Sequence, residues 1–250
     1  MTDARRRLKG EWGITVPAEG IAAGARIALR MAQTLAFGKS GRPLGEWLAV
    51  VIAMTAVDLL AISPCLLGRD ALYGRLTAGK ALSGADLRRY WRAGEYKRAL
   101  AWRLGMWRRR LTAYGLGWLP GTALWAIGTR TRLAAVHRGE TDFLAFGFFA
   151  AGALALAAGT MAAALWMLRW RPAAWLIGRG ASPREAFAQS RRITRGRTGE
   201  LVRFYRGQTG WLLAGAAALP GLYARPVRRM REATLFQKWA AALEKTKRMC

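Results

Sequence analysis

The stretch that decides the fold is FLAFGFFAAGALALAAGTMAAALWML, residues 143–168. It contains 26 residues and no charged side chain, and it is followed directly by Arg169, Trp170 and Arg171. A helix of this length extends about 39 Å, which exceeds the roughly 30 Å hydrocarbon core of a bilayer. Trp and Arg are residues that settle at the membrane–water interface. The stretch therefore predicts a transmembrane helix that crosses with some tilt.

The charge balance of the chain indicates what its polar segments bind. The sequence carries 41 Lys and Arg against 14 Asp and Glu, a formal net charge of +27. Such an excess is typical of proteins that bind nucleic acid or an anionic lipid surface. Because the basic residues lie between and beside apolar blocks, we expect anionic membrane lipids as partners and no nucleic acid.

Three further blocks are candidates for crossing the membrane. Residues 47–67 are apolar apart from Asp58, whereas residues 111–129 and 207–224 carry no charged side chain. The last two blocks are close to the ~20 residues that a span needs, and each contains helix-breaking residues. These breakers are Pro120, Gly121, Pro220 and Gly221.

An N-terminal segment, residues 14–37, has a different pattern. Apolar residues follow helical spacing along one face, while Glu19, Arg26 and Arg30 share the other face. The apolar face consists of Ile21, Ala25, Ala28, Ala32 and Leu35. The pattern predicts either an interfacial amphipathic helix or a helix packed with its polar face inward.

The remaining polar segments form a repeated arrangement. Ser83 with Asp86, and Ser182 with Glu185, have the spacing of a helix capping box. Each box opens a basic amphipathic helix, and each basic helix leads into a block that contains Leu-Pro-Gly. We therefore predict two similar halves, residues 44–129 and 130–224, between a basic N-terminal part, 1–43, and a basic tail, 225–250. The arginines expected to contact lipid head groups are Arg108, Arg109, Arg110, Arg191 and Arg192.

The predicted fold class is all-α: a multi-pass transmembrane helical bundle with basic amphipathic helices between spans. The number of crossings stays open between four and six. If the four apolar blocks alone cross, Lys and Arg divide 22 against 19 between the two sides. If residues 14–37 also cross and residues 207–224 do not, the division is 34 against 5, which favours a cytoplasmic N-terminus. Two arginines within residues 14–37 oppose that insertion.

Several landmarks carry a family resemblance. They include Leu8-Lys-Gly-Glu-Trp-Gly13, Pro64-Cys-Leu-Leu-Gly68, Pro120-Gly121, and the long segment from Ala174 through Ser182-Pro-Arg-Glu185 to Ser190, followed by Gly210-Trp211 and Gly221. In this order they resemble an uncharacterised family of bacterial integral membrane proteins, catalogued only as a domain of unknown function. Glu11 stands where that family usually has Asn, and the final span is shorter. The resemblance implies a multi-pass protein of the bacterial inner membrane and supplies no reaction.

Asp58 is the strongest candidate for a functional residue because it lies near the middle of its apolar block. A charged carboxylate at the centre of a bilayer costs about 2.5–3.5 kcal/mol, so Asp58 requires a partner or a proton. The functional interpretation is a proton or cation site in a small transporter or channel component. The structural interpretation is an interhelical pair, with Arg26 or Arg30 as the expected partner.

Other features favour structural roles. Gly147, Ala151, Ala155, Gly159 and Ala163 recur every four residues and predict a ridge against which another helix packs closely. His137 is the only histidine, and the two cysteines form no metal-ligand cluster, so we expect no metal, no cofactor and no enzymatic activity. We predict a membrane-embedded interaction or assembly protein, with other membrane proteins or a second copy of the chain as candidate partners.

Overall fold

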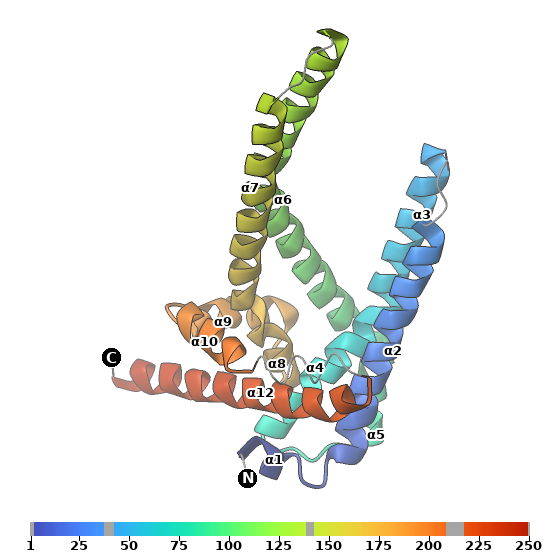
Figure 1. The fold of residues 1–250 in the computed structure, drawn as a ribbon. Helices are drawn as coiled ribbons and strands as arrows, with labels where there is room; N and C mark the ends of the chain where they lie inside the picture. Colours follow the sequence, from blue (N-terminus) through green and yellow to red (C-terminus); the bar gives the residue numbers. More distant parts are fainter. Residues whose placement is uncertain (1–2, 38–42, 139–142, 209–217, 250) are drawn as a thin grey trace. The chain divides into compact units, whose positions relative to one another are not determined.

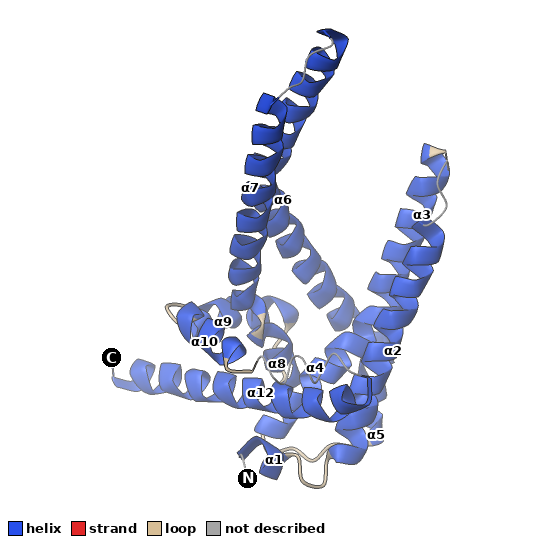
Figure 2. Ribbon diagram, viewed as in Figure 1, coloured by secondary structure: helices blue, strands red, loops and turns tan. Residues whose placement is uncertain are grey.

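The computed structural model describes residues 3–37, 43–138, 143–208 and 218–249 (Figure 1). Within these ranges every regular element is a helix and no strand occurs (Figure 2). The all-α class predicted from the sequence is therefore confirmed.

The helices are bounded by the apolar runs and the capping residues of the sequence. Both predicted capping boxes form: the side chains of Asp86 and Glu185 accept hydrogen bonds from the backbone N–H groups of Ser83 and Ser182. The elements in chain order are α1 Asp3–Arg7, α2 Trp12–Phe37, α3 Leu44–Val57, η1 Asp58–Ile62, α4 Ser63–Thr77, α5 Gly84–Arg88, η2 Arg89–Trp91, α6 Ala93–Arg138, α7 Phe143–Met167, η3 Leu168–Trp170, α8 Pro172–Gly178, α9 Pro183–Thr194, α10 Thr198–Arg206 and α12 Ala218–Met249. η1 is a π-helical turn, whereas η2 and η3 are 3₁₀ turns.

The chain folds into two compact units. The first combines Met1–Leu104 with Trp170–Cys250, and the second is Gly105–Arg169. The long helix α6 begins in the first unit and continues through the second. The two predicted halves, residues 44–129 and 130–224, do not coincide with these units.

α4 and α8 pack against each other in the core of the first unit. A Cβ atom on Gly74 would lie 2.2 Å from the carbonyl oxygen of Trp175, and one on Gly178 would lie 2.1 Å from that of Ala71. Since Ala71 faces Gly178 and Gly74 faces Trp175, the two helices run antiparallel. Only glycine permits backbones to approach this closely, so these two residues determine where the helices touch.

α2 packs against α3 and α4 with a face that the apolar pattern did not indicate. The buried residues of α2 are small or polar: Thr15, Ala18, Glu19 and Ala22. Two residues of the expected apolar face, Ile21 and Leu35, are instead 53% and 75% exposed. Of the two predicted alternatives, the structure therefore favours a helix whose Glu19 side packs inward.

α12 is a long helix that packs on α1, α2, α4, α8 and α9 (Figure 1). One row of buried apolar side chains on α12 recurs at every third position: Ala224, Val227, Met230, Ala233, Phe236 and Trp239. The predicted span at residues 207–224 lies partly outside the described residues, and its final part, 218–224, forms the start of α12. Pro220 and Gly221 both lie within α12, so the expected break there does not interrupt this helix.

The second unit is an antiparallel hairpin of α6 and α7. A Cβ atom on Gly159 would lie only 1.8 Å from the carbonyl oxygen of Gly117, and one on Gly121 would lie 2.8 Å from that of Gly152. The Gly117 and Gly121 pair therefore forms a close helix contact. Pro120 lies inside α6, which continues to Arg138, so the predicted interruption of the helix at Pro120 is wrong.

The packing ridge of α7 has a different register from the predicted one. Gly159 contacts α6 and Ala163 is buried, as expected, but a Cβ atom added to Gly147 would meet nothing within 4 Å and Ala151 is exposed. The buried positions nearer the start of α7 are Ala145 and Gly152. Because small residues occupy most of α7, the sequence allows several registers, and Trp125 and Phe149 fix the observed one through an edge-to-face contact at 5.4 Å.

Two stretches of the described helices have the length and apolar character needed to cross a membrane, Gly45–Thr77 and Phe143–Gly178. By length and composition alone, a core helix of a soluble protein also meets this criterion. Such a core helix is mostly buried, however, whereas only 17% of the apolar window in Phe143–Gly178 is buried. Two of the predicted spans thus have the required properties, which is weak evidence for a membrane protein.

Candidate functional site

Asp58 opens the π-helical turn η1, which joins α3 to α4. π-Turns inside α-helices occur frequently at functional sites. The widened turn is held by two hydroxyl groups: Ser63 Oγ donates to the Asp58 carbonyl at 3.1 Å, and Tyr96 Oη donates to the Leu60 carbonyl at 2.9 Å. Asp58 itself is 8% exposed, so its charge requires compensation.

That compensation comes from Arg103 on α6. Arg103 donates from one terminal nitrogen to both carboxylate oxygens of Asp58, at 2.7 and 2.6 Å, and from Nε to Oδ2 at 3.2 Å. Sequence reasoning expected Arg26 or Arg30 in this place, but both are exposed on α2. The expected kind of partner, an arginine on another helix, is present, and its identity is corrected to Arg103.

A second cluster of charges joins α2, α4 and α12. Glu19 is 1% exposed, and its Oε1 lies 2.7 Å from Nε of Arg229 and accepts a hydrogen bond from Tyr73 Oη at 3.1 Å. Asp70 accepts a hydrogen bond from Arg69 at 2.7 Å and lies 2.8 Å from a terminal nitrogen of Arg229. Arg69 also lies 3.7 Å from the second oxygen of Glu19. Two carboxylates are therefore balanced by two arginines.

The cluster keeps Arg229 charged. Burial opposes the charged form of the guanidinium, but the carboxylates of Asp70 and Glu19 outweigh it and raise the pKa of Arg229 above its ordinary value. The charged Arg229 on α12 is therefore bound by one carboxylate from α2 and one from α4. We call Glu19, Arg69, Asp70, Tyr73 and Arg229 the Glu19 cluster, and we infer that it fixes α12 onto α2 and α4.

A neighbouring group consists of Arg171, Tyr205 and Glu232. Tyr205 Oη donates to Glu232 and accepts a hydrogen bond from Nε of Arg171 at 3.1 Å. Burial and the nearby Glu232 carboxylate raise the pKa of Tyr205, so this phenol stays protonated at neutral pH. The cavity beside this group has a volume of about 40 Å³, which suffices for a water molecule and not for an organic substrate.

Sequence reasoning did not identify Glu19, Arg69, Tyr73 or Arg229 as a site. One signal was available: Glu19 shares a helical face with Thr15, Ala18 and Ala22, and a strip of small residues marks a closely packed face. Arg229 carried no comparable signal because it is one of 41 basic residues.

The arginines predicted to contact lipid occupy exposed positions for the most part. Arg108 and Arg110 on α6, and Arg191 and Arg192 on α9, are exposed, whereas Arg109 is half-buried and donates to the Gly105 carbonyl at 2.8 Å. The opposite face of α9 is buried, and its residues include Phe187, Ser190 and Ile193. The helix is therefore amphipathic, as its sequence predicted.

Within the described residues, His, Cys, Asp and Glu side chains form no group that could hold a metal ion. His137 is exposed at the end of α6, and its Nδ1 lies 2.7 Å from the Leu133 carbonyl oxygen. Comparisons with protein-family profiles, curated proteins and solved structures gave no match. The resemblance to an uncharacterised bacterial membrane family therefore stays a prediction.

Proposed function

We propose that this chain is a multi-pass protein of a bacterial inner membrane that serves as an interaction or assembly protein and binds anionic lipids. The observation that carries the proposal is the exposed apolar surface of the α6–α7 hairpin. Four of its side chains are between 71% and 82% exposed: Phe143, Leu144, Phe146 and Leu154. A hairpin that exposes so much apolar surface requires lipid or another protein to cover it.

A second helical hairpin has the same character. α2 and α3 run side by side, and their outward faces expose Met31, Leu35 and Ile52 at 61%, 75% and 67%. We propose that α2 and α3 form one pair of crossings and that α6 and α7 form a second pair. Arg26 and Arg30 then lie on a helix in the membrane, where long side chains reach toward polar groups or the interface.

The distribution of basic residues supports this topology. The two hairpin tips would carry 5 of the Lys and Arg residues, whereas 34 would lie in the segments that connect the hairpins and flank them. The positive-inside rule then places the N-terminus, the basic helices and α12 in the cytoplasm. Because each cation near an anionic surface contributes about 1 kcal/mol, exposed arginines of α6 and α9 suit lipid head groups.

A transporter role, the alternative considered from the sequence, has little support. Its central group was Asp58, and both oxygens of that carboxylate are bound by Arg103. A carboxylate held in a bidentate pair with a permanent cation serves a structural role, because releasing it to bind a cation would leave Arg103 buried without its counterion.

Labelling of single cysteines tests the topology. In a chain with Cys65→Ser and Cys250→Ser, His137→Cys probes a hairpin tip and Lys238→Cys probes α12. An impermeant thiol reagent should label His137→Cys only from the outside and Lys238→Cys only from the inside of sealed vesicles. Labelling of both from the same side would contradict the proposal, as would release of the chain from membranes by alkaline carbonate.

Lipid binding is tested separately. Reversal of Arg108, Arg110, Arg191 and Arg192 to Glu should reduce the number of phosphatidylglycerol molecules that stay bound in detergent, while membrane insertion is retained. Unchanged phosphatidylglycerol binding, or salt-sensitive retention of DNA or RNA by the wild-type chain, would contradict the assignment of lipid as the partner.

A further inference from the structure

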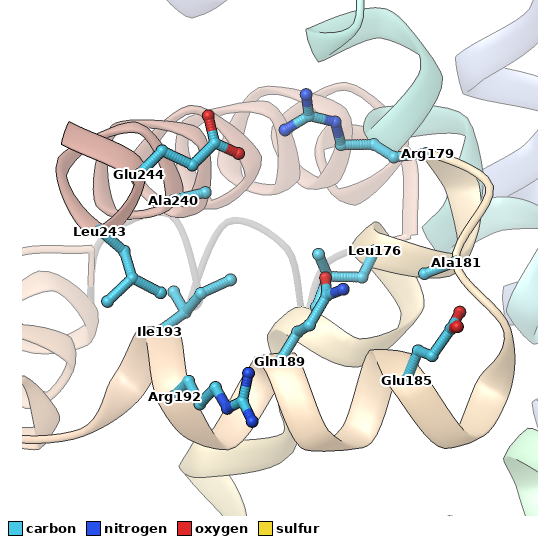
Figure 3. A pocket seen from close by; sticks show the side chains of 10 residues that line it. All are labelled: Leu176, Arg179, Ala181, Glu185, Gln189, Arg192, Ile193, Ala240, Leu243 and Glu244. Carbon is cyan, nitrogen blue, oxygen red and sulfur yellow. The ribbon is translucent and has the colours of Figure 1, made fainter. Parts of the chain in front are cut away.

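A cleft of about 440 Å³ lies between α8, α9 and α12 in the first unit (Figure 3). This volume is within the roughly 300–1,000 Å³ of small-molecule sites. α8 follows the apolar helix α7 after the single turn η3, so the chain reaches the cleft directly after a proposed crossing. The helices that form the cleft therefore follow a proposed crossing directly in the sequence.

The cleft has an apolar interior and a charged rim. Leu176, Ile193 and Leu243 contribute the large apolar side chains, one from each of the three helices. The charged residues are two arginines and two glutamates: Arg179, Arg192, Glu185 and Glu244. In Figure 3 the Arg179 guanidinium and the Glu244 carboxylate point toward each other on the α12 side, while Arg192 and Glu185 lie on α9 with Gln189 between them.

Two of these four charges are held in place. The guanidinium of Arg179 lies over the Trp175 ring, 5.0 Å from its centroid, and Glu185 accepts the Ser182 N–H at 3.0 Å. The side chains of Arg192 and Glu244 form no hydrogen bond or ion pair with the described part of the chain. Arg179 and Glu185 are therefore fixed, whereas the side chains of Arg192 and Glu244 can move to contact a ligand. This arrangement suits a ligand that carries both a positive and a negative charge.

The charge of the rim decides the class of ligand. The chain as a whole carries +27, yet the two arginines and two glutamates of the rim sum to zero. A purely anionic head group would meet two repulsive carboxylates here, although it would be attracted almost anywhere else on the basic surface. A zwitterion offers a phosphate to an arginine and an ammonium to a glutamate, so it matches both signs of charge in the rim.

We propose that this cleft binds the head group of a phospholipid with a primary ammonium, as in phosphatidylethanolamine. The phosphodiester contacts Arg192, the ammonium contacts Glu244, and the apolar interior accepts the adjoining glycerol and first acyl carbons. This inference rests on the proposed membrane location and deepens it, because it separates one specific lipid site from the general attraction of basic helices for anionic lipids.

The test uses the full chain in nanodiscs that contain phosphatidylethanolamine, phosphatidylglycerol and phosphatidylcholine in equal amounts. After transfer to detergent, native mass spectrometry counts the retained lipids. The wild-type chain should retain phosphatidylethanolamine in preference to phosphatidylcholine, whose quaternary ammonium has no N–H to donate to Glu244. Arg192→Gln and Glu244→Gln should each weaken this retention by about three- to five-fold, the effect of losing one partly exposed charge pair.

Matched controls remove the same charges elsewhere. Arg184→Gln removes an exposed arginine from the same helix and Glu46→Gln lies on α3, and neither residue lines the cleft. Both should leave the phosphatidylethanolamine preference unchanged, and circular dichroism should show that all four variants are folded. Equal loss in Arg184→Gln and Arg192→Gln, or no preference in the wild type, would overturn the proposal.

A competition experiment with a soluble compound distinguishes the lipid from a free zwitterion. Glycerophosphoethanolamine carries the same head group without acyl chains, and its competition with the lipid is measured by the same count. If the free compound displaces the lipid at equal concentration, the assignment to a lipid is overturned. Failure of these experiments in a chain that labels with the expected topology would refute the cleft alone, whereas a chain absent from membranes would refute the proposed function.

Discussion

Arg103 binds both carboxylate oxygens of Asp58, and each of the two residues is 8% exposed. The pair joins the start of η1 to α6 across 45 positions of sequence. Because both charges are buried, each depends on the other more than an exposed pair would. The relationship makes Asp58 a structural residue whose loss should be felt as instability.

Removal of one member of this pair should destabilise the fold strongly. We expect Asp58→Asn and Arg103→Gln each to lower the free energy of unfolding by about 3–5 kcal/mol, because each leaves an uncompensated buried charge. The double variant should lose less than the sum of the two single losses. Unfolding in mixed micelles, monitored by circular dichroism, measures all three values.

Arg108→Gln is the matched control because it removes an exposed arginine from the same helix. It should change the free energy of unfolding by no more than about 0.5 kcal/mol. Full stability of Asp58→Asn, combined with additive losses in the double variant, would show that the two residues act independently.

The close approach of α6 and α7 gives a second prediction. Gly159→Ala places a methyl group within 1.8 Å of the Gly117 carbonyl oxygen, so the helices must separate. We expect a loss of about 1–3 kcal/mol in the free energy of unfolding. Gly147→Ala, whose added methyl group would meet nothing within 4 Å, should instead stabilise α7 by about 0.5–1 kcal/mol. The same micelle assay compares them, and equal effects would refute the observed register of the hairpin.

Local features of the sequence predicted local features of the structure. The uncharged run at residues 143–168 indicated α7, and the Ser83 and Ser182 capping boxes indicated helix starts, because these signals are complete within a few neighbouring residues. The start of η1 at Asp58 and the continuity of α6 through Pro120 were not predicted. In both cases packing against other helices decides the backbone, and single-helix patterns do not contain that information.

The partners of the charged residues were predicted least well. Asp58 clearly needed a counterion, but 41 basic residues were available and the fold selected Arg103. For α2 the sequence left an inward polar face as one of two alternatives, but it did not identify the partners of Glu19, because Arg229 and Tyr73 are brought to it from distant parts of the chain. Such pairings depend on tertiary structure, so composition and periodicity cannot rank the alternatives.

Arg229 should be the most sensitive residue of α12. It lies 2.7 Å from Glu19 and 2.8 Å from Asp70, so Arg229→Gln leaves the buried Glu19 and the half-buried Asp70 with one arginine, Arg69. We expect a loss of about 3–5 kcal/mol and faster proteolysis of α12. Arg228→Gln removes the neighbouring charge and should cost much less, because Arg228 lacks an ion pair within the described residues. Equal protease sensitivity in the two variants would refute the inference that the Glu19 cluster fixes α12 onto α2 and α4.

Stability in acid should depend on Glu95. Burial opposes ionisation of this carboxyl, but hydrogen bonds from Arg89 at 2.8 Å and Arg98 at 3.2 Å outweigh it and lower the pKa of Glu95 below 4.5. Because the folded-state pKa is the lower one, the stabilisation is present above the unfolded-state pKa and is lost as pH falls through the folded-state pKa. Wild type should therefore exceed Glu95→Gln at pH 7 by less than about 1 kcal/mol, since the group is partly exposed. Unfolding midpoints measured from about pH 7 to pH 3 should converge toward the acid end, and a difference that grows as pH falls would contradict the assignment.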